Sequence, residues 1–290
     1  DTLLVAAFED DAQLSNSGSA HVHVLQAGVW QYQQMLVPFD EGAGDHFGFS
    51  IDLAADTALI SAWGKDSHTG SAYLFRRDAG AWTQDQRMTA CDAAIDDELG
   101  TSVAFEEGTA LLGAPNDDDT LSESGSVAVF AISLGNFERY GFGDGSATAC
   151  PCSNASLALY AQGCANSTGR GGKLSVAGSD SAGADDFRMV ACNLIAGNPG
   201  LLYSGPNRIN AGAGIVFGNG LRLDGGSIDR HGVRVPNADG RASWGPGIGG
   251  MSGWTAGNTV HFQVWYRDPF HGTCVDVFNL TNAVSVLFQA

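Results

Sequence analysis

The stretch FGFSIDLAADTALISAW, residues 47–63, with GSAYLF, residues 70–75, decides the fold of the first half of the chain. It divides into three short apolar or alternating runs, each closed by Gly, Asp or Ser. That pattern is typical of strands joined by tight turns. We therefore expect this stretch to be one unit of an all-β repeat.

The same unit recurs on both sides of this stretch. Gly18-Ser19, Gly70-Ser71 and Gly125-Ser126 lie 52 and 55 residues apart, and Trp30 and Trp82 repeat the 52-residue spacing. A period near 50 residues with several strands per unit is typical of propeller blades, because one small sheet cannot bury both of its faces without neighbours. The sequence therefore predicts stacked blades.

Two of these units carry residues of a known repeat. Asp45–Ser50 (DHFGFS) with Leu59–Trp63 (LISAW), and Leu99–Ala104 (LGTSVA) with Leu112–Pro115 (LGAP), resemble bacterial FG-GAP repeats, which are related to the blades of integrin α-chain propellers. The resemblance implies a partial propeller over roughly residues 1–132. It implies little about chemistry.

The number of strands predicts that this propeller is incomplete. At four strands per blade, residues 1–132 hold about two and a half blades, whereas a closed propeller needs at least four. The chain is also expected to begin in mid-blade, because Asp1–Val5 (DTLLV) aligns with Asp56–Ile60 (DTALI). A longer precursor, the second domain or other chains would each cover the open edges, and uncovered edges recruit strands.

Covering by other chains is the interpretation that we favour. We expect the contact to involve the first strand and the last strand of the chain. The residues are Leu3, Leu4, Val5, Val284, Val286 and Phe288.

The pattern of apolar runs and glycines changes in the second half of the sequence. Residues 133–149 contain four glycines and predict a linker. Residues 150–290 hold short strands broken by Gly, with clean alternation in Thr259–Tyr266 (TVHFQVWY). This pattern is typical of a two-sheet β-sandwich.

The cysteines predict an oxidising compartment and structural disulfides. Their number is even, and three Asn-x-Ser/Thr sequons accompany them. A bond between Cys150 and Cys152 would be strained, so we expect other pairings, which pin the linker to the sandwich. The six residues are Cys91, Cys150, Cys152, Cys164, Cys192 and Cys274. We expect a secreted chain whose signal peptide has already been removed.

The second half also resembles a known module. Cys150–Asn154 (CPCSN), Gly163–Gly169 (GCANSTG), Trp265–Pro269 (WYRDP) and Phe278–Ala283 (FNLTNA) are similar to a C-terminal module of secreted planctomycete and myxobacterial proteins. The resemblance covers residues 140–290. It implies an extracellular or surface location and no particular mechanism.

The net charge of -18 lies entirely in the first half of the chain. Residues 1–135 hold 22 Asp and Glu against 4 Lys and Arg, and residues 136–290 hold 10 of each. Such a field disfavours nucleic acid and anionic lipid, and it favours cations or basic partners. No apolar run has the roughly 18 to 20 residues of a membrane span, so we expect no membrane insertion.

Two further groups of residues are candidate binding sites. Asp10 and Asp11, and Asp117, Asp118 and Asp119, occupy equivalent blade turns. They are either solvated carboxylates or a Ca²⁺ site, which needs several oxygen ligands; no other cofactor is indicated. In the sandwich, three tryptophans are either core residues or a platform for sugar rings. These are Trp244, Trp254 and Trp265.

The chain lacks the local motifs of common hydrolases. It has no Gly-x-Ser-x-Gly and no His-Glu-x-x-His, so we expect a protein that is not an enzyme. Our first hypothesis is an extracellular structural or surface protein that assembles with copies of itself, into a filament if the contact does not close. The alternatives are a Ca²⁺-dependent adhesion or carbohydrate-binding module, with surface polysaccharide or another surface protein as partner, and a secreted hydrolase with an unrecognised site.

Overall fold

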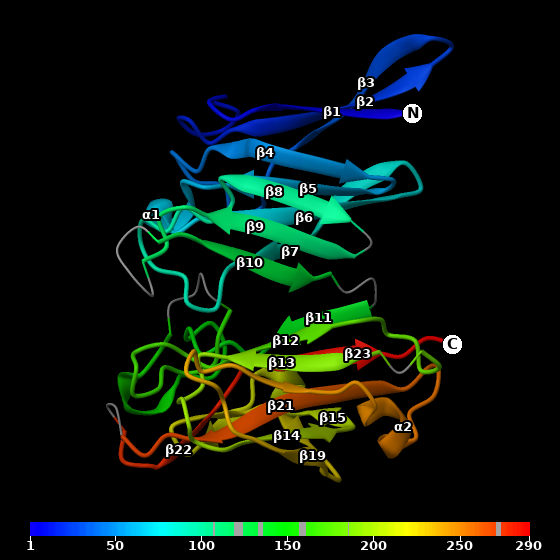
Figure 1. Ribbon diagram of the computed structural model, residues 1–290. Helices are drawn as coiled ribbons and strands as arrows, with labels where there is room; N and C mark the ends of the chain where they lie inside the picture. The colour runs from blue at the N-terminus through cyan, green and yellow to red at the C-terminus, as the bar shows by residue number, and fades with distance from the viewer. Residues whose placement is uncertain (107, 119–123, 133–135, 157–160, 185, 271–273) are drawn as a thin grey trace. The chain divides into compact units, whose positions relative to one another are not determined.

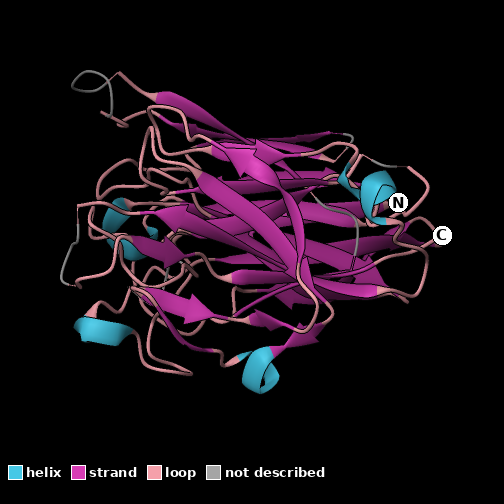
Figure 2. Cartoon of the chain, turned by 90° about the horizontal axis from the view of Figure 1, so that it is seen from below, coloured by secondary structure: helices cyan, strands magenta, loops and turns pink. Residues whose placement is uncertain are grey.

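The protein is built almost entirely of strands, as Figure 2 shows by colour. The computed structural model describes residues 1–290 except 107, 119–123, 133–135, 157–160, 185 and 271–273. The chain divides into two compact units, Asp1–Ala131 (unit 1) and Ile132–Ala290 (unit 2). Within the described residues, no helix has the length and apolar character needed to cross a membrane. The all-β prediction is confirmed.

Unit 1 consists of three antiparallel sheets that follow one another along the chain (Figure 1). The first sheet has the order β1-β2-β3, the middle sheet β4-β5-β6-β7 and the third sheet β8-β9-β10. The strands are β1 (Thr2–Ala7), β2 (Ser19–Gln26), β3 (Val29–Leu36), β4 (Phe47–Ala54), β5 (Thr57–Ala62), β6 (Ser71–Asp78), β7 (Ala81–Met88), β8 (Ser102–Glu106), β9 (Thr109–Ala114) and β10 (Ser126–Ala131). Among the described residues, only the middle sheet has all four strands of a blade, which confirms the incomplete propeller.

Repeated turns explain why the sheets share one plan. The β2–β3 hairpin turns at Ala27-Gly28 and the β6–β7 hairpin at Ala79-Gly80, with positive φ at all four residues. Two consecutive left-handed residues make the turn whose twist matches that of paired strands. The 52-residue spacing of the sequence is therefore the spacing of these hairpins.

The middle sheet is buried on both faces. Ile60 and Phe75 pack with Leu4 and Val22 of the first sheet. On the opposite face, Leu59 is fully buried. Strands buried on both sides are apolar without alternation, which accounts for the run in β5.

Backbone contacts join each sheet to the next. Gly18 forms a parallel bridge with Phe47, and Gly70 forms the same bridge with Leu99. At the second junction, Phe105 N also donates a hydrogen bond of 2.7 Å to Asp52 Oδ2. The two junctions are therefore copies of one arrangement, built from the repeat residues themselves.

Unit 2 is built on a sandwich of two antiparallel sheets, to which two small two-stranded sheets are added. One has the order β11-β23-β21-β14-β19, with β22 paired to β21, and the other has the order β12-β13-β20. Its elements are β11 (Asn136–Tyr140), β12 (Lys173–Ala177), β13 (Arg188–Cys192), β14 (Gly200–Gly205), β15 (Asn207–Arg208), β16 (Ile215–Phe217), β17 (Gly220–Arg222), β18 (Asp224–Gly225), β19 (Asp229–Arg234), β20 (Ala242–Trp244), β21 (Thr259–Arg267), β22 (Phe278–Leu280) and β23 (Ala283–Leu287). Leu174, Met189, Phe262 and Val264 from the two sheets share one core.

The predicted linker is partly a strand. Residues 136–140 form β11, which pairs with β23 over its whole length. Phe137 packs against the sandwich core and Tyr140 is 7% exposed. The glycines of this segment suggested a linker, but Phe137 and Tyr140 bury enough apolar surface to hold a strand between them.

Candidate functional site

The outer face of the third sheet exposes apolar side chains at positions that the middle sheet buries. In the middle sheet, Leu59 and Leu74 pair in register and are both 0% exposed. Their repeat equivalents, Leu111 and Val129, pair in the same register and are 42% and 62% exposed. Val127, on the same face, is 63% exposed. The third sheet thus exposes a face whose counterpart in the middle sheet is fully buried.

The outer face of the first sheet is open in the same way. Ile60 and Trp82 of the middle sheet are 0% and 3% exposed, whereas their equivalents Val5 and Trp30 are 46% and 44% exposed. Leu3, also on this face, is 39% exposed. Taken by itself, unit 1 therefore has two open faces of different composition.

Only part of the predicted assembly surface lies on these faces. Leu3 and Val5 are exposed there, whereas Leu4 points to the opposite face and packs against the middle sheet. The prediction that the C-terminal strand inserts into a neighbour is wrong. The strand β23 pairs with both β11 and β21, so it has no free edge. Its predicted contact residues are 0 to 1% exposed in the sandwich core, namely Val284, Val286 and Phe288.

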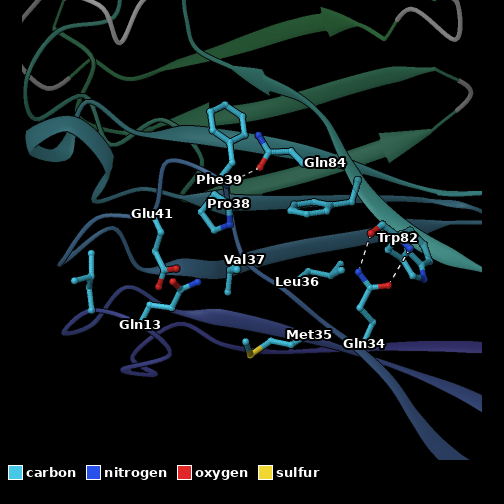
Figure 3. A pocket seen from close by; sticks show the side chains of 12 residues that line it. Gln13, Gln34, Met35, Leu36, Val37, Pro38, Phe39, Glu41, Trp82 and Gln84 are labelled. Carbon is cyan, nitrogen blue, oxygen red and sulfur yellow. Dashed lines mark hydrogen bonds between the residues drawn. The ribbon is translucent and has the colours of Figure 1, made fainter.

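A cavity of about 530 Å³ lies between the first and middle sheets, and Figure 3 shows its lining. Leu36, Phe75 and Trp82 are at most 3% exposed and form its apolar floor. One wall is fixed by Gln34, whose Nε2 donates to Trp82 O at 2.7 Å and whose Oε1 accepts from Trp82 N at 2.9 Å. No local sequence pattern predicts this cavity, because its lining comes from two repeats.

Glu41 is the charged residue of the cavity lining. Both of its carboxylate oxygens are buried, and neither has a hydrogen-bond partner among the described residues. The segment from Val37 to Glu41 is held against β7, because Phe39 N donates to Gln84 Oε1 at 3.0 Å. The backbone of this segment therefore fixes the position of Glu41, and no described hydrogen-bond donor contacts its carboxylate.

The acidic loops do not gather their described carboxylates into a metal site. Asp10 Oδ2 accepts from Ser19 Oγ at 2.6 Å, and Asp11 Oδ1 accepts from Asn16 N at 2.8 Å. Asp117 is 9% exposed. Among the described residues, no three His, Cys, Asp or Glu side chains are grouped to hold a metal ion. Asp118 lies in the same loop, Asp119 lies outside the described residues, and calcium binding stays a prediction.

The three predicted platform tryptophans do not share a surface. Trp244 is 0% exposed and donates from Nε1 to Gly232 O at 2.8 Å. Trp254 stacks on Phe288 at the edge of the core. Trp265 lies on β21 one position from Val264, so it faces away from that core. Trp244 is a core residue, as one of the two interpretations predicted. The three tryptophans do not form one platform for sugar rings.

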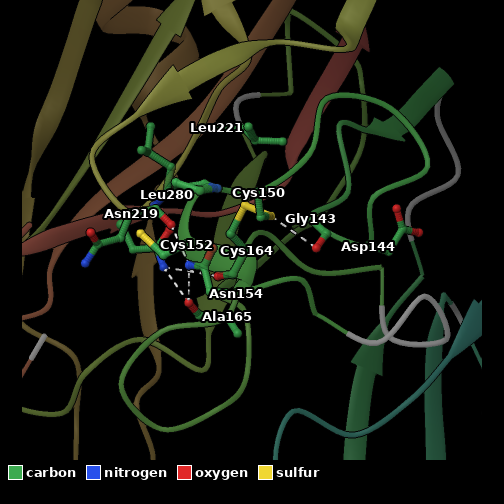
Figure 4. The surroundings of a disulfide bond; sticks show 12 residues. Gly143, Asp144, Cys150, Cys152, Asn154, Cys164, Ala165, Asn219, Leu221 and Leu280 are labelled. Atoms are coloured by element: carbon green, nitrogen blue, oxygen red, sulfur yellow. Dashed lines mark hydrogen bonds between the residues drawn. A yellow bond between two sulfur atoms is a disulfide. The ribbon is translucent and has the colours of Figure 1, made fainter. Parts of the chain in front are cut away.

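Two disulfides fix the start of unit 2 to the sandwich, as Figure 4 shows for one of them. Cys150 is bonded to Cys164, and Cys152 to Cys274. All six cysteines are described and none is free. The predicted disulfide-stapled sandwich is confirmed, and neighbouring Cys150 and Cys152 use different partners.

The sequon asparagines are structural. Asn154 Nδ2 donates to Ala165 O and to Asn219 O, both at 2.8 Å. Asn166 Nδ2 donates to Asn193 O at 2.7 Å. Asn279 is 0% exposed and also donates to Ala165 O. An acceptor for a glycan must be exposed, so these asparagines serve the fold of the disulfide region instead.

A serine–histidine pair in unit 2 was not visible from sequence. His261 Nδ1 lies 2.6 Å from Ser285 Oγ, and burial lowers the pKa of His261. Arg208 Nη2 donates to the same hydroxyl at 2.8 Å. Ser285 and His261 are only 5% and 7% exposed, so the pair is buried and links β21 to β23. That the protein is not an enzyme stays a prediction.

The repeat geometry agrees with a comparison to known families. The FG-GAP repeat family matches residues 30–75 and 82–130. Both segments are FG-GAP repeats. No curated protein matches the chain. FG-GAP repeats together with disulfides are features of an extracellular or surface protein. The resemblance of residues 140–290 to the C-terminal secreted module stays a prediction.

Proposed function

We propose that the protein is a non-enzymatic extracellular structural protein that assembles with copies of itself through the two open faces of unit 1. The observation that carries this proposal is the exposure of Leu111, Val127 and Val129 at 42%, 63% and 62%, where the preceding repeat is fully buried. Apolar patches of this kind on an otherwise polar surface are typical of interaction sites.

The two open faces differ, so the contact between copies is head to tail. The third sheet of one copy would dock on the first sheet of the next, where Val5 and Trp30 are exposed. The third sheet also offers Gly125, whose φ of 66° is positive like that of Gly18 and Gly70 at the two existing junctions. Two copies in a closed ring would give six sheets, within the range of known propellers, and an open arrangement would give a filament.

The test is the molar mass in solution over a range of concentrations. We expect masses at multiples of the 30.1 kDa chain by light scattering after size-exclusion chromatography. Val127→Ser with Val129→Ser should weaken association at least tenfold, because each valine loses apolar burial in the contact. The matched control is Val233→Ser with Val235→Ser, which changes valines 56% and 62% exposed in unit 2.

Two results would contradict the proposal. One is a wild-type protein that is monomeric at every concentration. The other is a Val127/Val129 variant that associates as strongly as the wild type and the unit 2 control.

A further inference from the structure

The cavity between the first and middle sheets buries a carboxylate without a donor. Both oxygens of Glu41 are inaccessible and unpartnered among the described residues. In Figure 3 the side chain points toward Gln13 at the edge of the cavity. A buried charge that lacks a partner is costly, because it has lost its hydration and no hydrogen bond or ion pair replaces it. The site therefore suits a ligand that brings hydrogen-bond donors and positive charge.

The protein does not supply that positive charge itself. The four basic residues of unit 1 are all described, and each is committed to another acid. Lys65 contacts Asp45 at 2.8 Å, Arg76 contacts Asp85 at 2.9 Å, Arg87 contacts Asp40 at 2.8 Å, and Arg77 contacts Asp56. With 22 acidic and 4 basic residues in residues 1–135, the surrounding field also attracts cations.

Much of the rest of the lining is apolar, alongside the side chains of Gln13, Gln34 and Gln84. Beyond the floor described above, the rim carries Leu14, Met35 and Phe39, which are 45%, 38% and 81% exposed. Deeper in the lining, Trp82 is 3% exposed, and its Nε1 has no partner among the described residues. A cavity of about 530 Å³ that combines apolar and polar side chains has the size of a small-ligand site.

We propose that this cavity binds an organic cation, a primary ammonium or guanidinium group on an apolar chain, with Glu41 as its charge partner. The ammonium donates to Glu41 once a shift of the neighbouring Gln13 side chain uncovers the carboxylate, and the chain packs over the floor formed by Leu36, Phe75 and Trp82. Such a group occurs in free amines and in the lysine or arginine side chains of a partner protein. This site is separate from the two open faces that support self-assembly.

Isothermal titration calorimetry with n-hexylammonium tests the proposal. We expect binding by the wild type, and at least tenfold weaker binding by Glu41→Gln, which keeps the shape and loses the charge. Glu9→Gln, at an exposed position outside the cavity, is the matched control and should bind like the wild type. Hexan-1-ol and hexanoate should bind at least tenfold more weakly than hexylammonium, because neither carries positive charge.

The source of the cation is distinguished by two further probes. N-acetyl-lysine amide presents the same ammonium as a protein side chain, and a short lysine-containing peptide adds backbone around it. Tighter binding of the peptide than of hexylammonium would identify a partner protein. Equal or weaker binding of the peptide would identify a free amine.

Thermal unfolding gives a second readout that does not depend on binding heat. Glu41→Gln should unfold at a higher temperature than the ligand-free wild type, because it removes an uncompensated buried charge. Hexylammonium should raise the Tm of the wild type and not that of the variant. Leu14→Lys, at an exposed rim position, should weaken hexylammonium binding by charge repulsion. Equal binding by the wild type and Glu41→Gln, equal binding of hexanoate, or no binding of any amine would overturn the proposal.

Discussion

Gly70 and Leu99 approach so closely that a Cβ atom on Gly70 would lie 2.2 Å from the carbonyl oxygen of Leu99. The bridge between them joins the middle sheet to the third sheet. Gly18 and Phe47 repeat the relationship one unit earlier, with a corresponding distance of 2.1 Å. Glycine at this repeat position is therefore required by the junction between sheets as well as by its positive φ.

Gly70→Ala should lower the free energy of unfolding of unit 1 by about 3 kcal/mol or more, because it combines crowding with a left-handed backbone. Gly80→Ala is the matched control, with a φ of 88° and nothing within 4 Å of the added Cβ. It should cost only about 1 kcal/mol. Urea unfolding measures both, and equal losses would show that the contact with Leu99 is unimportant.

Association between copies should strengthen with salt. Unit 1 carries a net charge of 4 − 22 = −18 over residues 1–135, so two copies repel one another while their apolar faces attract. Raising NaCl from about 0.05 M to about 0.5 M shortens the screening length to a few ångströms and removes most of that repulsion. Sedimentation equilibrium measures the change. Weaker association at high salt would indicate a contact made by ion pairs and not by Leu111, Val127 and Val129.

The repeat could be predicted because its signals are local. The apolar runs and the glycines before Ser19, Ser71 and Ser126 recur at spacings of 52 and 55 residues, and each glycine marks the start of a strand. Counting strands predicted open sheet edges, whereas the exposed apolar faces of the first and third sheets were not predicted. The segment containing β11 was mistaken for a linker because glycines flank it. Its partner strand β23 lies at the other end of unit 2 in the sequence, so no local pattern indicates the pairing.

The candidate cavity could not be predicted for the same reason. Glu41 lies in a connecting segment, and the floor beneath it comes from Leu36, Phe75 and Trp82 in two different sheets. The burial of Val284 and Phe288 depends likewise on distant strands, whereas the sequence shows only an apolar alternating run near the C-terminus. Local pattern identifies a strand but not which surface covers it.

Unit 2 should lose stability as the pH rises from about 4 to about 7, because of Asp224. This carboxyl is 0% exposed, accepts a hydrogen bond from the Tyr140 hydroxyl, and has its pKa raised by burial to about 7. An unfolded Asp has a pKa of about 3.9. The protonated group therefore favours folding fully below about pH 4, and this contribution is lost as the pH approaches 7.

Asp224→Asn stays neutral at every pH and keeps an acceptor for Tyr140, so it should flatten this dependence. Asp239→Asn, in an exposed turn, is the control and should keep the wild-type profile. Guanidinium unfolding of unit 2 at several pH values between about 4 and about 8 supplies the comparison. A wild-type profile that rises over this range would show that another group dominates.

The two disulfides of unit 2 should contribute unequally to its stability. Cys150 and Cys164 are 14 residues apart, whereas Cys152 and Cys274 are 122 residues apart. Because a cross-link restricts the unfolded chain more when it closes a longer loop, Cys152→Ser with Cys274→Ser should cost about 2 kcal/mol more than Cys150→Ser with Cys164→Ser. Guanidinium unfolding of the two double variants measures the difference. Cys150 and Cys152 are two residues apart, so both disulfides hold the same local structure around Asn154. Equal losses of stability would mean that this local structure, and not loop entropy, determines the contribution of each disulfide.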